Sequence, residues 1–314
     1  MNEPISFIPL AMERVWGGRR LAELPDKSLP PDVPIGELWE VVDRKEEQSI
    51  VHGGALDGLS LHDLWTKHRE NIFGADYASS TSPRFPLLVK LLDASDKLSV
   101  QVHPPLHKAD ELGGEPKTEV WYFLDTLPGA NIYAGLKKGA TRAQFESLLA
   151  SGGVESTLHD TLVHSGESIF IPSGRLHAIG AGNVIIEVQQ NSDTTYRVFD
   201  WNRCGLDGKP RALHIEESMA SIDFNDFEPK VKSASESLVA DCPFFHIEKT
   251  TISAPVDVRP QGRFAMVVST DHEVSCAGKT FGRGQFFIVP ASSENAAVLP
   301  VNQPATLLVT TLPV

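Results

Sequence analysis

The stretch GESIFIPSGRLHAIG, residues 166–180, contains the pattern that decides the fold. Gly166 turns the chain into a short apolar strand, and Pro172 ends that strand. Gly174 then supplies a tight turn that needs permissive backbone dihedrals. The imidazole of His177 projects from the start of the following strand. The spacing Gly-x5-Pro-x-Gly-x2-His therefore predicts two consecutive strands with a histidine presented where the second one begins.

A similar stretch, GQFFIVPASSENAAV, begins at Gly284. Aligning the two starting glycines places Pro290 on Pro172 and Asn295 on His177. Either the match is a chance similarity between short stretches, or one supersecondary unit occurs twice. In the second case the later copy has lost the imidazole, so we expect a degenerate β module that supports the first.

Strand signals dominate the rest of the chain, without the alternation of strands and helices that is typical of a parallel sheet. We expect strands at LWEVVD (38–43), LLVKLLD (87–93), KLSVQVH (97–103), EVWYFLD (119–125), NIYAGL (131–136), SIFIP (168–172) and VIIEVQQ (184–190). Two segments, 60–74 and 141–153, have helical spacing instead, with Ser60 and Thr141 as N-caps. The sequence therefore predicts a mainly β sandwich or barrel with a few inserted helices.

Composition divides the chain into three parts. Residues 1–220 contain most of the strand signals and every candidate site residue, so we expect a catalytic domain there. Residues 221–243 are polar with few strand signals and are expected to form a connecting segment. Strand signals resume in residues 244–314, which we expect to form the degenerate C-terminal β module.

A second stretch, LSVQVHPP at residues 98–105, places Gln101 and His103 on one face of a strand. The two are either a hydrogen-bonded pair in the core or two arms of a metal site. The glycine, proline and histidine pattern quoted first resembles the second motif of the cupin superfamily. The first cupin motif has two ligands two residues apart, followed by a carboxylate on the next strand. Gln101 and His103 fit the pair of ligands, and Glu119 fits the carboxylate. The resemblance implies a cupin jelly roll and, with His177, a four-ligand metal site.

Two imidazoles, one carboxylate and one amide suit Zn²⁺, with an open position for water or substrate. Fe²⁺ and Mn²⁺ accept similar ligands. We expect one Zn²⁺ per chain.

Longer stretches narrow the resemblance to one family. The sequence resembles type I mannose-6-phosphate isomerases of the short bacterial form, on VWGG (15–18), GELWEV (36–41), PLLVKLLDASDKLSVQVHP (86–104), PKTEVWYFLD (116–125), IPSGRLHAIG (171–180) and EVQQNSDTTYRVFDW (187–201). This resemblance implies an aldose–ketose isomerase acting on mannose 6-phosphate and fructose 6-phosphate. It also implies that the zinc ligands are Gln101, His103, Glu119 and His177, and that Arg197 is the active-site arginine.

An isomerase of this kind moves hydrogen between C1 and C2 through an enediolate, which develops negative charge on O1 and O2. Zn²⁺ and an arginine can both stabilise that charge. Glu187 lies in the apolar run VIIEVQQ, where desolvation raises a carboxylate pKa as a catalytic base requires. Its alternative role is an ion pair with Arg197. Arg197 itself, flanked by aromatic residues, either pairs with a carboxylate or receives an anionic ligand.

Four further residues are candidates for contacting the substrate. Lys117 precedes Glu119 on the same strand face and is expected to take part in catalysis. Lys90, a charged residue inside LLVKLL, is either a substrate contact or a snorkelling lysine. Arg203 is expected to contact phosphate, although longer family members have a lysine near this position. Trp16 either lines the pocket or packs in the core.

The composition restricts the partners and the compartment. A net charge of −13 argues against nucleic acid or an anionic membrane as the main partner. No apolar run approaches the roughly 20 residues of a membrane helix, and the N-terminus lacks a signal-peptide pattern. Three widely spaced cysteines suit a reducing cytoplasm. We therefore expect a cytoplasmic enzyme, a monomer or homodimer, with a small sugar phosphate as its partner.

Two other functions fit parts of the pattern. An iron-dependent cupin oxygenase would use the same ligands but no set of cations for phosphate. A non-catalytic sugar-phosphate sensor would keep the fold and lose a metal ligand, whereas all four candidate ligands are present here.

Overall fold

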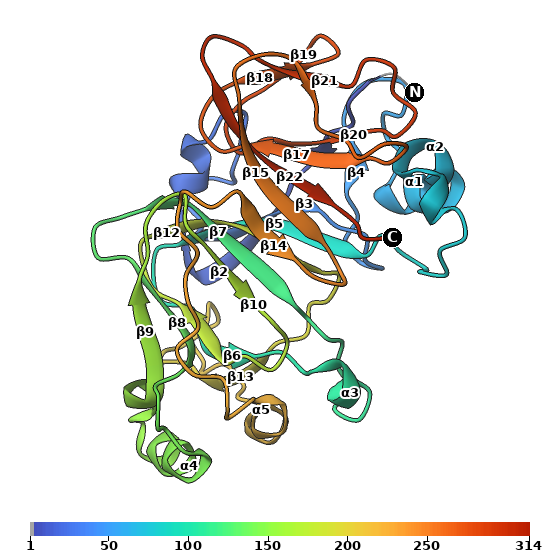
Figure 1. Ribbon diagram of the computed structural model, residues 1–314. Coiled ribbons are helices and arrows are strands. Elements are labelled where there is room, and N and C mark those ends of the chain that lie inside the picture. The colour runs from blue at the N-terminus through green and yellow to red at the C-terminus, as the bar shows by residue number, and fades with distance from the viewer. Residues whose placement is uncertain (1–2) are drawn as a thin grey trace.

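Four β-sheets stacked in layers form most of the computed structural model, which describes residues 3–314 (Figure 1). We call the two sheets of the N-terminal part the central sheet and the outer sheet. The central sheet contains, in spatial order, β10 (Ser168–Ile171), β7 (Glu119–Thr126), β12 (Asn183–Gln190), β5 (Leu87–Ala94), β3 (Ile35–Val41) and β2 (Leu10–Gly18). The outer sheet contains β13 (Tyr196–Phe199), β6 (Val100–Val102), β11 (His177–Ile179), β8 (Asn131–Leu136) and β9 (Leu158–Leu162).

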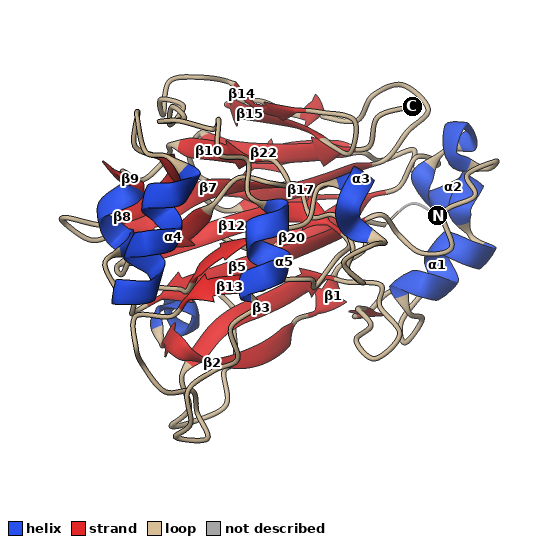
Figure 2. Cartoon of the chain, turned by 90° about the horizontal axis from the view of Figure 1, so that it is seen from below, coloured by secondary structure: helices blue, strands red, loops and turns tan. Residues whose placement is uncertain are grey.

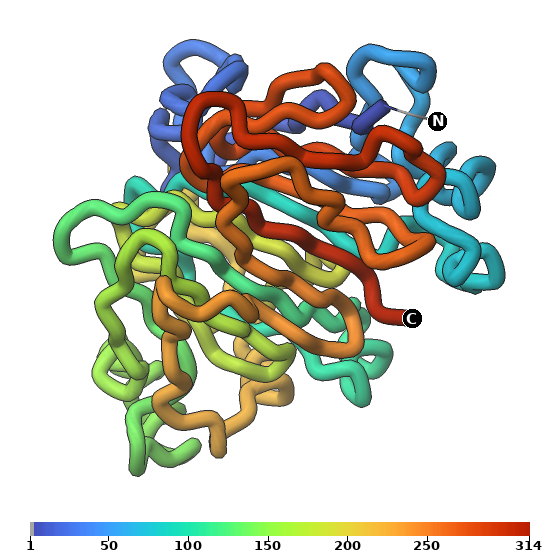
Figure 3. The backbone as a smooth tube through the Cα atoms, turned by 45° about the horizontal axis from the view of Figure 1, so that its top comes forward, coloured from blue at the N-terminus to red at the C-terminus, as the bar shows by residue number. Residues whose placement is uncertain are grey.

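The C-terminal part also has two sheets. Its inner sheet contains β14 (Leu238–Asp241), β15 (His246–Ile252), β22 (Ala305–Thr311), β17 (Ala265–Ser269) and β20 (Phe286–Val289). Its distal sheet contains β16 (Val256–Asp257), β21 (Ala297–Pro300), β18 (Val274–Cys276) and β19 (Lys279–Phe281). A short pair, β1 (Phe7–Ile8) and β4 (Ile50–Val51), lies near the N-terminus, and Figure 3 shows the blue N-terminal chain beside the orange and red C-terminal chain. A backbone bridge joins Ile5 to Ile288 there.

Short helices cover the edges and one face of this stack. They are α1 (Leu61–Lys67), α2 (Arg69–Phe73), α3 (Leu106–Ala109), α4 (Arg142–Ser151) and α5 (Ile215–Ser221), with 3-10 turns at Arg20–Glu23, Ala75–Tyr77 and Val154–Thr157. Figure 2 views the molecule from the side on which α4 and α5 lie over the strands, and Phe145 of α4 packs with the outer sheet. Within residues 3–314, each helix is too short or too polar to cross a lipid bilayer.

The central sheet is covered on both faces, which explains its apolar sequence. All eight residues of β5 are buried. Side chains alternate between the two faces of a strand. Leu91 accordingly joins the core shared with the inner C-terminal sheet, whereas Leu92 joins the core shared with the outer sheet. The C-terminal part therefore packs behind the central sheet, on the face opposite to the outer sheet. The expected mainly β cupin fold, with a few inserted helices, is confirmed.

The two halves share one order of strand pairing. β7 pairs with β10 and β12, and β8 pairs with β9 and β11. In the C-terminal half β17 pairs with β20 and β22, and β18 pairs with β19 and β21. Gly166 and Gly284 both have positive φ, 88° and 75°, before the corresponding strands. This order agrees with a duplicated unit; the degenerate cupin character of the second half stays a prediction, as do the domain limits.

The predicted helix over residues 60–74 is two helices. The backbone of His68, with φ −126° and ψ 17°, leaves helical geometry between α1 and α2. The expected N-caps are confirmed, since both Ser60 and Thr141 form capping boxes. β14 lies inside the expected connecting segment 221–243 and forms the edge of the inner C-terminal sheet.

The interface between α2 and the C-terminal part contains an aromatic cluster whose truncation is expected to destabilise the fold. The ring of Phe264 is 1% exposed and lies 5.1 Å from Phe73 and 6.1 Å from Phe85, between centroids. Phe264→Ala is expected to lower the free energy of unfolding by about 3 kcal/mol, because it leaves a cavity in a packed core. Urea denaturation measures this, with Phe227→Ala, at a 37% exposed position, as the control. Equal losses in the two variants would contradict the packing role.

Candidate metal centre and substrate pocket

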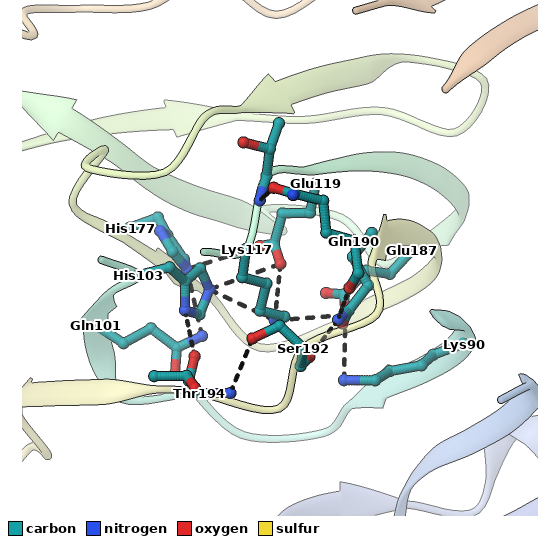
Figure 4. A network of polar contacts seen from close by, with 12 residues as sticks. Lys90, Gln101, His103, Lys117, Glu119, His177, Glu187, Gln190, Ser192 and Thr194 are labelled. Atoms are coloured by element: carbon teal, nitrogen blue, oxygen red, sulfur yellow. Dashed lines mark hydrogen bonds and ion pairs between the residues drawn. The ribbon is translucent and has the colours of Figure 1, made fainter. Parts of the chain in front are cut away.

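Three buried side chains meet where the central and outer sheets face each other. His103 follows β6, Glu119 begins β7 and His177 begins β11. Their ligand atoms all lie within 4.8 Å of one another, and Figure 4 shows the two imidazoles and the carboxylate turned toward a common point. Gln101 lies directly opposite His177 in the pairing of β6 with β11. The structure thus brings the four predicted metal ligands together.

Backbone carbonyls fix the orientation of both imidazoles. His103 Nδ1 lies 2.8 Å from the carbonyl oxygen of Thr194, and His177 Nδ1 lies 2.8 Å from that of Arg175. A carbonyl oxygen only accepts hydrogen bonds, so each Nδ1 carries the proton and each Nε2 keeps its lone pair for a ligand. The guanidinium of Arg175 is in turn held by both carboxylate oxygens of Asp226, at 2.7 and 2.8 Å.

The protonation states also suit a cation. Burial and the neighbouring Lys117 lower the pKa of His103 to about 3, and burial lowers the pKa of His177. Burial alone would raise the pKa of Glu119, but Lys117 and the two imidazoles hold it well below its ordinary value. The cluster therefore offers two neutral imidazoles and one carboxylate.

The donor set fits a metal ion such as Zn²⁺. Within residues 3–314 neither oxygen of Glu119 accepts a hydrogen bond of good geometry, although the Lys117 ammonium lies 2.7 Å from Oε2. A buried carboxylate without hydrogen bonds is costly unless a cation compensates it. Gln101 presents its Nε2 3.3 Å from His177 Nε2, so its amide must turn about the last side-chain torsion to offer Oε1. Two imidazoles, a carboxylate and an amide oxygen then complete a set that suits zinc.

A pocket of about 400 Å³ opens beside this cluster. Its lining includes the predicted residues Trp16, Lys90, Gln101, Lys117, Glu187 and Arg197. It also includes five charged or titratable residues that the sequence interpretation did not assign to the site, namely Arg14, Glu37, Asp193, Arg211 and His214. Among residues 3–314, no residue after His214 lines the pocket. The C-terminal part therefore packs behind the central sheet and does not contribute to the pocket wall.

Alternating charges run from the pocket to the metal cluster. Lys90 Nζ lies 3.3 Å from Glu187 Oε1, and Lys117 Nζ lies 3.8 Å from the same oxygen. Trp121 Nε1 donates a hydrogen bond of 3.1 Å to Glu187 Oε2. Glu187 therefore interacts with two lysines rather than with Arg197, the alternative partner considered above. Lys90 is 3% exposed and does not snorkel.

The two buried acids of the pocket have opposite pKa shifts. Burial raises the pKa of Glu187, and this effect exceeds the opposing charge of Lys117. Burial acts on Glu37 as well, but Lys90 and Arg14 lower its pKa to about 2, with a further contribution from the indole of Trp39. Of these two buried acids, Glu187 is therefore the one suited to accept a proton, while Glu37 stays ionised.

Arg203 is the predicted substrate residue that the structure does not bring to the pocket. Its guanidinium pairs with Asp200 at 3.1 Å and with Asp96 at 3.2 Å. Arg211 lines the pocket instead. The hairpin after β13, in which Cys204 bridges to Pro210, returns the chain to the pocket at Arg211. Spacing along the sequence does not reveal that the chain returns to the pocket here. The arginine at position 211, three residues before His214, was the sequence feature that could have indicated a second cation at the site.

The remaining residues that the sequence interpretation missed have weaker signals. Glu37 is a charged residue inside the buried strand β3, which also contains Glu40, and a charge inside a mainly apolar run is the same signal that identified Lys90. His214 accepts a hydrogen bond from Arg197 N at its Nδ1 and lines the pocket. Trp16 is 3% exposed and both lines the pocket and packs in the core.

Comparisons with known proteins identify the family of the chain. The family described as phosphomannose isomerase type I, catalytic domain, matches residues 7–122. The mannose-6-phosphate isomerase ManA of Bacillus subtilis is 34% identical over 278 residues, 85% of each chain. A crystal structure of the Bacillus subtilis mannose 6-phosphate isomerase has a TM-score of 0.83 at 29% identity and covers 99% of this chain and 100% of that one. A mannose 6-phosphate isomerase solved with zinc and yttrium has a TM-score of 0.69 at 18% identity, and the match covers 98% of this chain and 100% of that one. The chain belongs to the type I phosphomannose isomerase family.

Proposed function

We propose that the protein interconverts mannose 6-phosphate and fructose 6-phosphate at the pocket beside His103, Glu119 and His177. One observation carries the proposal: a buried cluster of two imidazoles and a carboxylate lies beside a small pocket that contains several cationic side chains and a buried carboxylate of raised pKa, Glu187. Aldose–ketose isomerisation needs this combination, because a base must act next to groups that stabilise negative charge.

Zinc is the proposed metal, held by Gln101, His103, Glu119 and His177. The neutral imidazoles and the carboxylate without hydrogen bonds support this assignment, and a mannose 6-phosphate isomerase of the same fold has been solved with zinc. When bound, the ion would act as a Lewis acid toward the sugar oxygens.

Glu187 is the proposed catalytic base. Its carboxylate takes the proton from C2 of the open-chain aldose and returns it to C1, while the hydroxyl proton of O2 passes to O1; these two shifts together convert the aldose into the ketose. Lys117 and Lys90 hold the carboxylate in place from two sides. Glu119 and Glu187 raise the pKa of Lys117 despite its burial, so its ammonium stays charged. Lys117 can then donate hydrogen bonds to O1 and O2 as they gain negative charge.

Arg197 and Arg211 are the proposed phosphate contacts. Both line the pocket, and Arg197 donates to the backbone carbonyl of Ala212 rather than to a carboxylate. Within the described chain its buried Nε has no hydrogen-bond partner, which supports an anionic ligand. Trp16 and Lys90 complete the pocket wall as contacts of the sugar.

We also propose a cytoplasmic location, with a monomer or a homodimer as the working form. Cys204, Cys242 and Cys276 are all free thiols, which suits a reducing compartment. Light scattering after size exclusion measures the oligomeric state.

A coupled assay for fructose 6-phosphate formed from mannose 6-phosphate tests the proposed function. We expect turnover by the zinc-loaded enzyme, loss of turnover after exhaustive chelation, and recovery when Zn²⁺ is returned. No turnover by a chain that contains one zinc ion would favour a sugar-phosphate sensor. Activity that survives complete removal of metal would contradict the metal role.

A further inference from the structure

A single buried carboxylate organises the arginines at the phosphate end of the pocket. Asp200 follows β13 and is 5% exposed. Its Oδ2 accepts a hydrogen bond of 2.7 Å from Arg211 Nε, and its Oδ1 accepts one of 2.5 Å from Arg211 Nη2. Oδ1 also accepts a hydrogen bond of 3.1 Å from Arg203 Nε. A planar guanidinium held by both oxygens of a carboxylate has a fixed direction. The Asp200 carboxylate therefore determines where the remaining donors of Arg211 point.

The charges around Asp200 leave an excess of positive charge. Arg203 also pairs with Asp96, at 3.2 Å. The Asp200 carboxylate holds Arg211, and its negative charge also acts on Arg197. Burial lowers the pKa of Arg197, and the next largest cause is the charge of Arg211. Two guanidiniums that repel each other beside one carboxylate are stabilised by a further anion.

Hydrogen bonds also hold Arg197 to residues that closely follow Arg211, namely Ala212 and His214. His214 N donates to the carbonyl of Arg197 at 2.8 Å, and Arg197 N donates to His214 Nδ1 at 3.2 Å. Arg197 Nη1 donates to the carbonyl of Ala212 at 2.9 Å. A change in the direction of Arg211 therefore alters a preformed pair of cations rather than an isolated side chain.

The backbone after Asp200 is unusual and firmly held. Trp201 and Asn202 are consecutive non-glycine residues with positive φ, 56° and 55°. Such a conformation is unfavourable for a tryptophan and persists where the surroundings impose it, often near functional sites. Here the indole Nε1 donates to the carbonyl of Leu98 at 2.6 Å, and Lys97 Nζ lies 4.3 Å from the ring centroid. The turn is thus anchored to the chain next to β6.

We infer that Asp200 is a positioning residue that directs Arg211 at the phosphate of the substrate and so determines the preference for phosphorylated over unphosphorylated sugars. The inference rests on the proposed function. Asp200 does not touch the reacting carbons, so its removal is expected to weaken binding of the phosphate and to leave proton transfer by Glu187 intact.

Asp200→Asn keeps the shape of the side chain and removes the charge that holds the Arg211 fork. We expect KM for mannose 6-phosphate to rise about tenfold, in line with a lost charge-assisted hydrogen-bonded pair, while kcat stays within about threefold. The Kd of inorganic phosphate for the zinc-loaded enzyme, measured by calorimetry, is expected to rise by a similar factor. This binding measurement does not depend on turnover, so it separates failure of the inference from failure of the proposed isomerase activity.

Asp257→Asn is the matched control. Asp257 holds Arg259 through the same pair of donors, Nε at 3.0 Å and Nη2 at 2.8 Å, in the C-terminal part. This variant is expected to leave KM and phosphate binding unchanged. Arg211→Gln provides a second route if Asp200→Asn fails to fold, and is expected to raise the same two constants. Unchanged KM and phosphate Kd in either pocket variant, or a loss confined to kcat, would overturn the inference.

Discussion

Glu119→Ala is expected to release the metal and abolish isomerase activity. Glu119 is the only carboxylate of the three-residue cluster, it is fully buried, and within the described part of the chain its oxygens accept no hydrogen bond of good geometry. Removing it leaves two neutral imidazoles and an amide, which neutralise none of the charge of Zn²⁺. Lewis-acid stabilisation is worth several kcal/mol, so we expect kcat/KM to fall by more than about a thousandfold.

The same substitution leaves a second group uncompensated. The ammonium of Lys117 lies 2.7 Å from Glu119 Oε2, is 5% exposed and would keep Glu187, at 3.8 Å, as its ion-pair partner within the described residues. Breaking a buried ion pair from one side costs about 3–5 kcal/mol, so the free energy of unfolding should also decrease. Metal analysis of the purified variant, alongside urea denaturation, separates the two effects.

Glu115→Ala is the control variant, because it removes a nearby acid whose cationic partners lie outside the metal cluster. Glu115 contacts Arg44 at 3.0 Å, and its side chain is 40% exposed. We expect one zinc ion per chain and ordinary turnover in this variant. A Glu119→Ala protein that retained a full complement of zinc would remove Glu119 from the ligand set.

The metal cluster could be predicted from the sequence because each ligand is tied to a local strand signal. His177 follows a turn marked by Pro172 and Gly174, and the structure places it at the first residue of β11. Gln101 and His103 alternate with apolar residues around β6. A period of two residues places such side chains on one face regardless of what the rest of the chain does. The candidate metal ligands therefore lie close together in the structure, as the resemblance implied.

The phosphate end could not be predicted in the same way. Arg203 and Arg211 both lie in a loop without periodicity, and only the fold decides that the first pairs with Asp96 and Asp200 while the second lines the pocket. Glu37 reaches the pocket because β3 pairs with β5, a contact between residues far apart in the sequence. The break at His68 had no proline or glycine to signal it. In each case tertiary contacts, rather than local propensity, determine the outcome.

Glu187→Gln is expected to lower kcat by about a thousandfold while zinc content and KM stay close to those of the parent enzyme. The amide has the size of the carboxylate and can still receive the hydrogen bond from Trp121, but it cannot accept a proton. Glu187 is not a proposed metal ligand, so a full zinc content distinguishes this loss from that of Glu119→Ala. Exchange of the C2 proton of mannose 6-phosphate with deuterium from solvent reports on the base directly, and this exchange should become undetectable.

The pH profile gives an independent test of the same residue. A base acts when ionised, so kcat falls as pH falls through its pKa. Burial raises the pKa of Glu187, which places the acidic limb of kcat above the ordinary glutamate value of 4.5. Glu187→Gln should abolish that limb. Glu40→Gln is the matched control: Glu40 is also buried, on the same sheet, but pairs with Lys27 at 2.6 Å and does not line the substrate pocket. It should keep kcat, the acidic limb and the exchange of the C2 proton. Solvent exchange that persisted in Glu187→Gln would assign the base to another group.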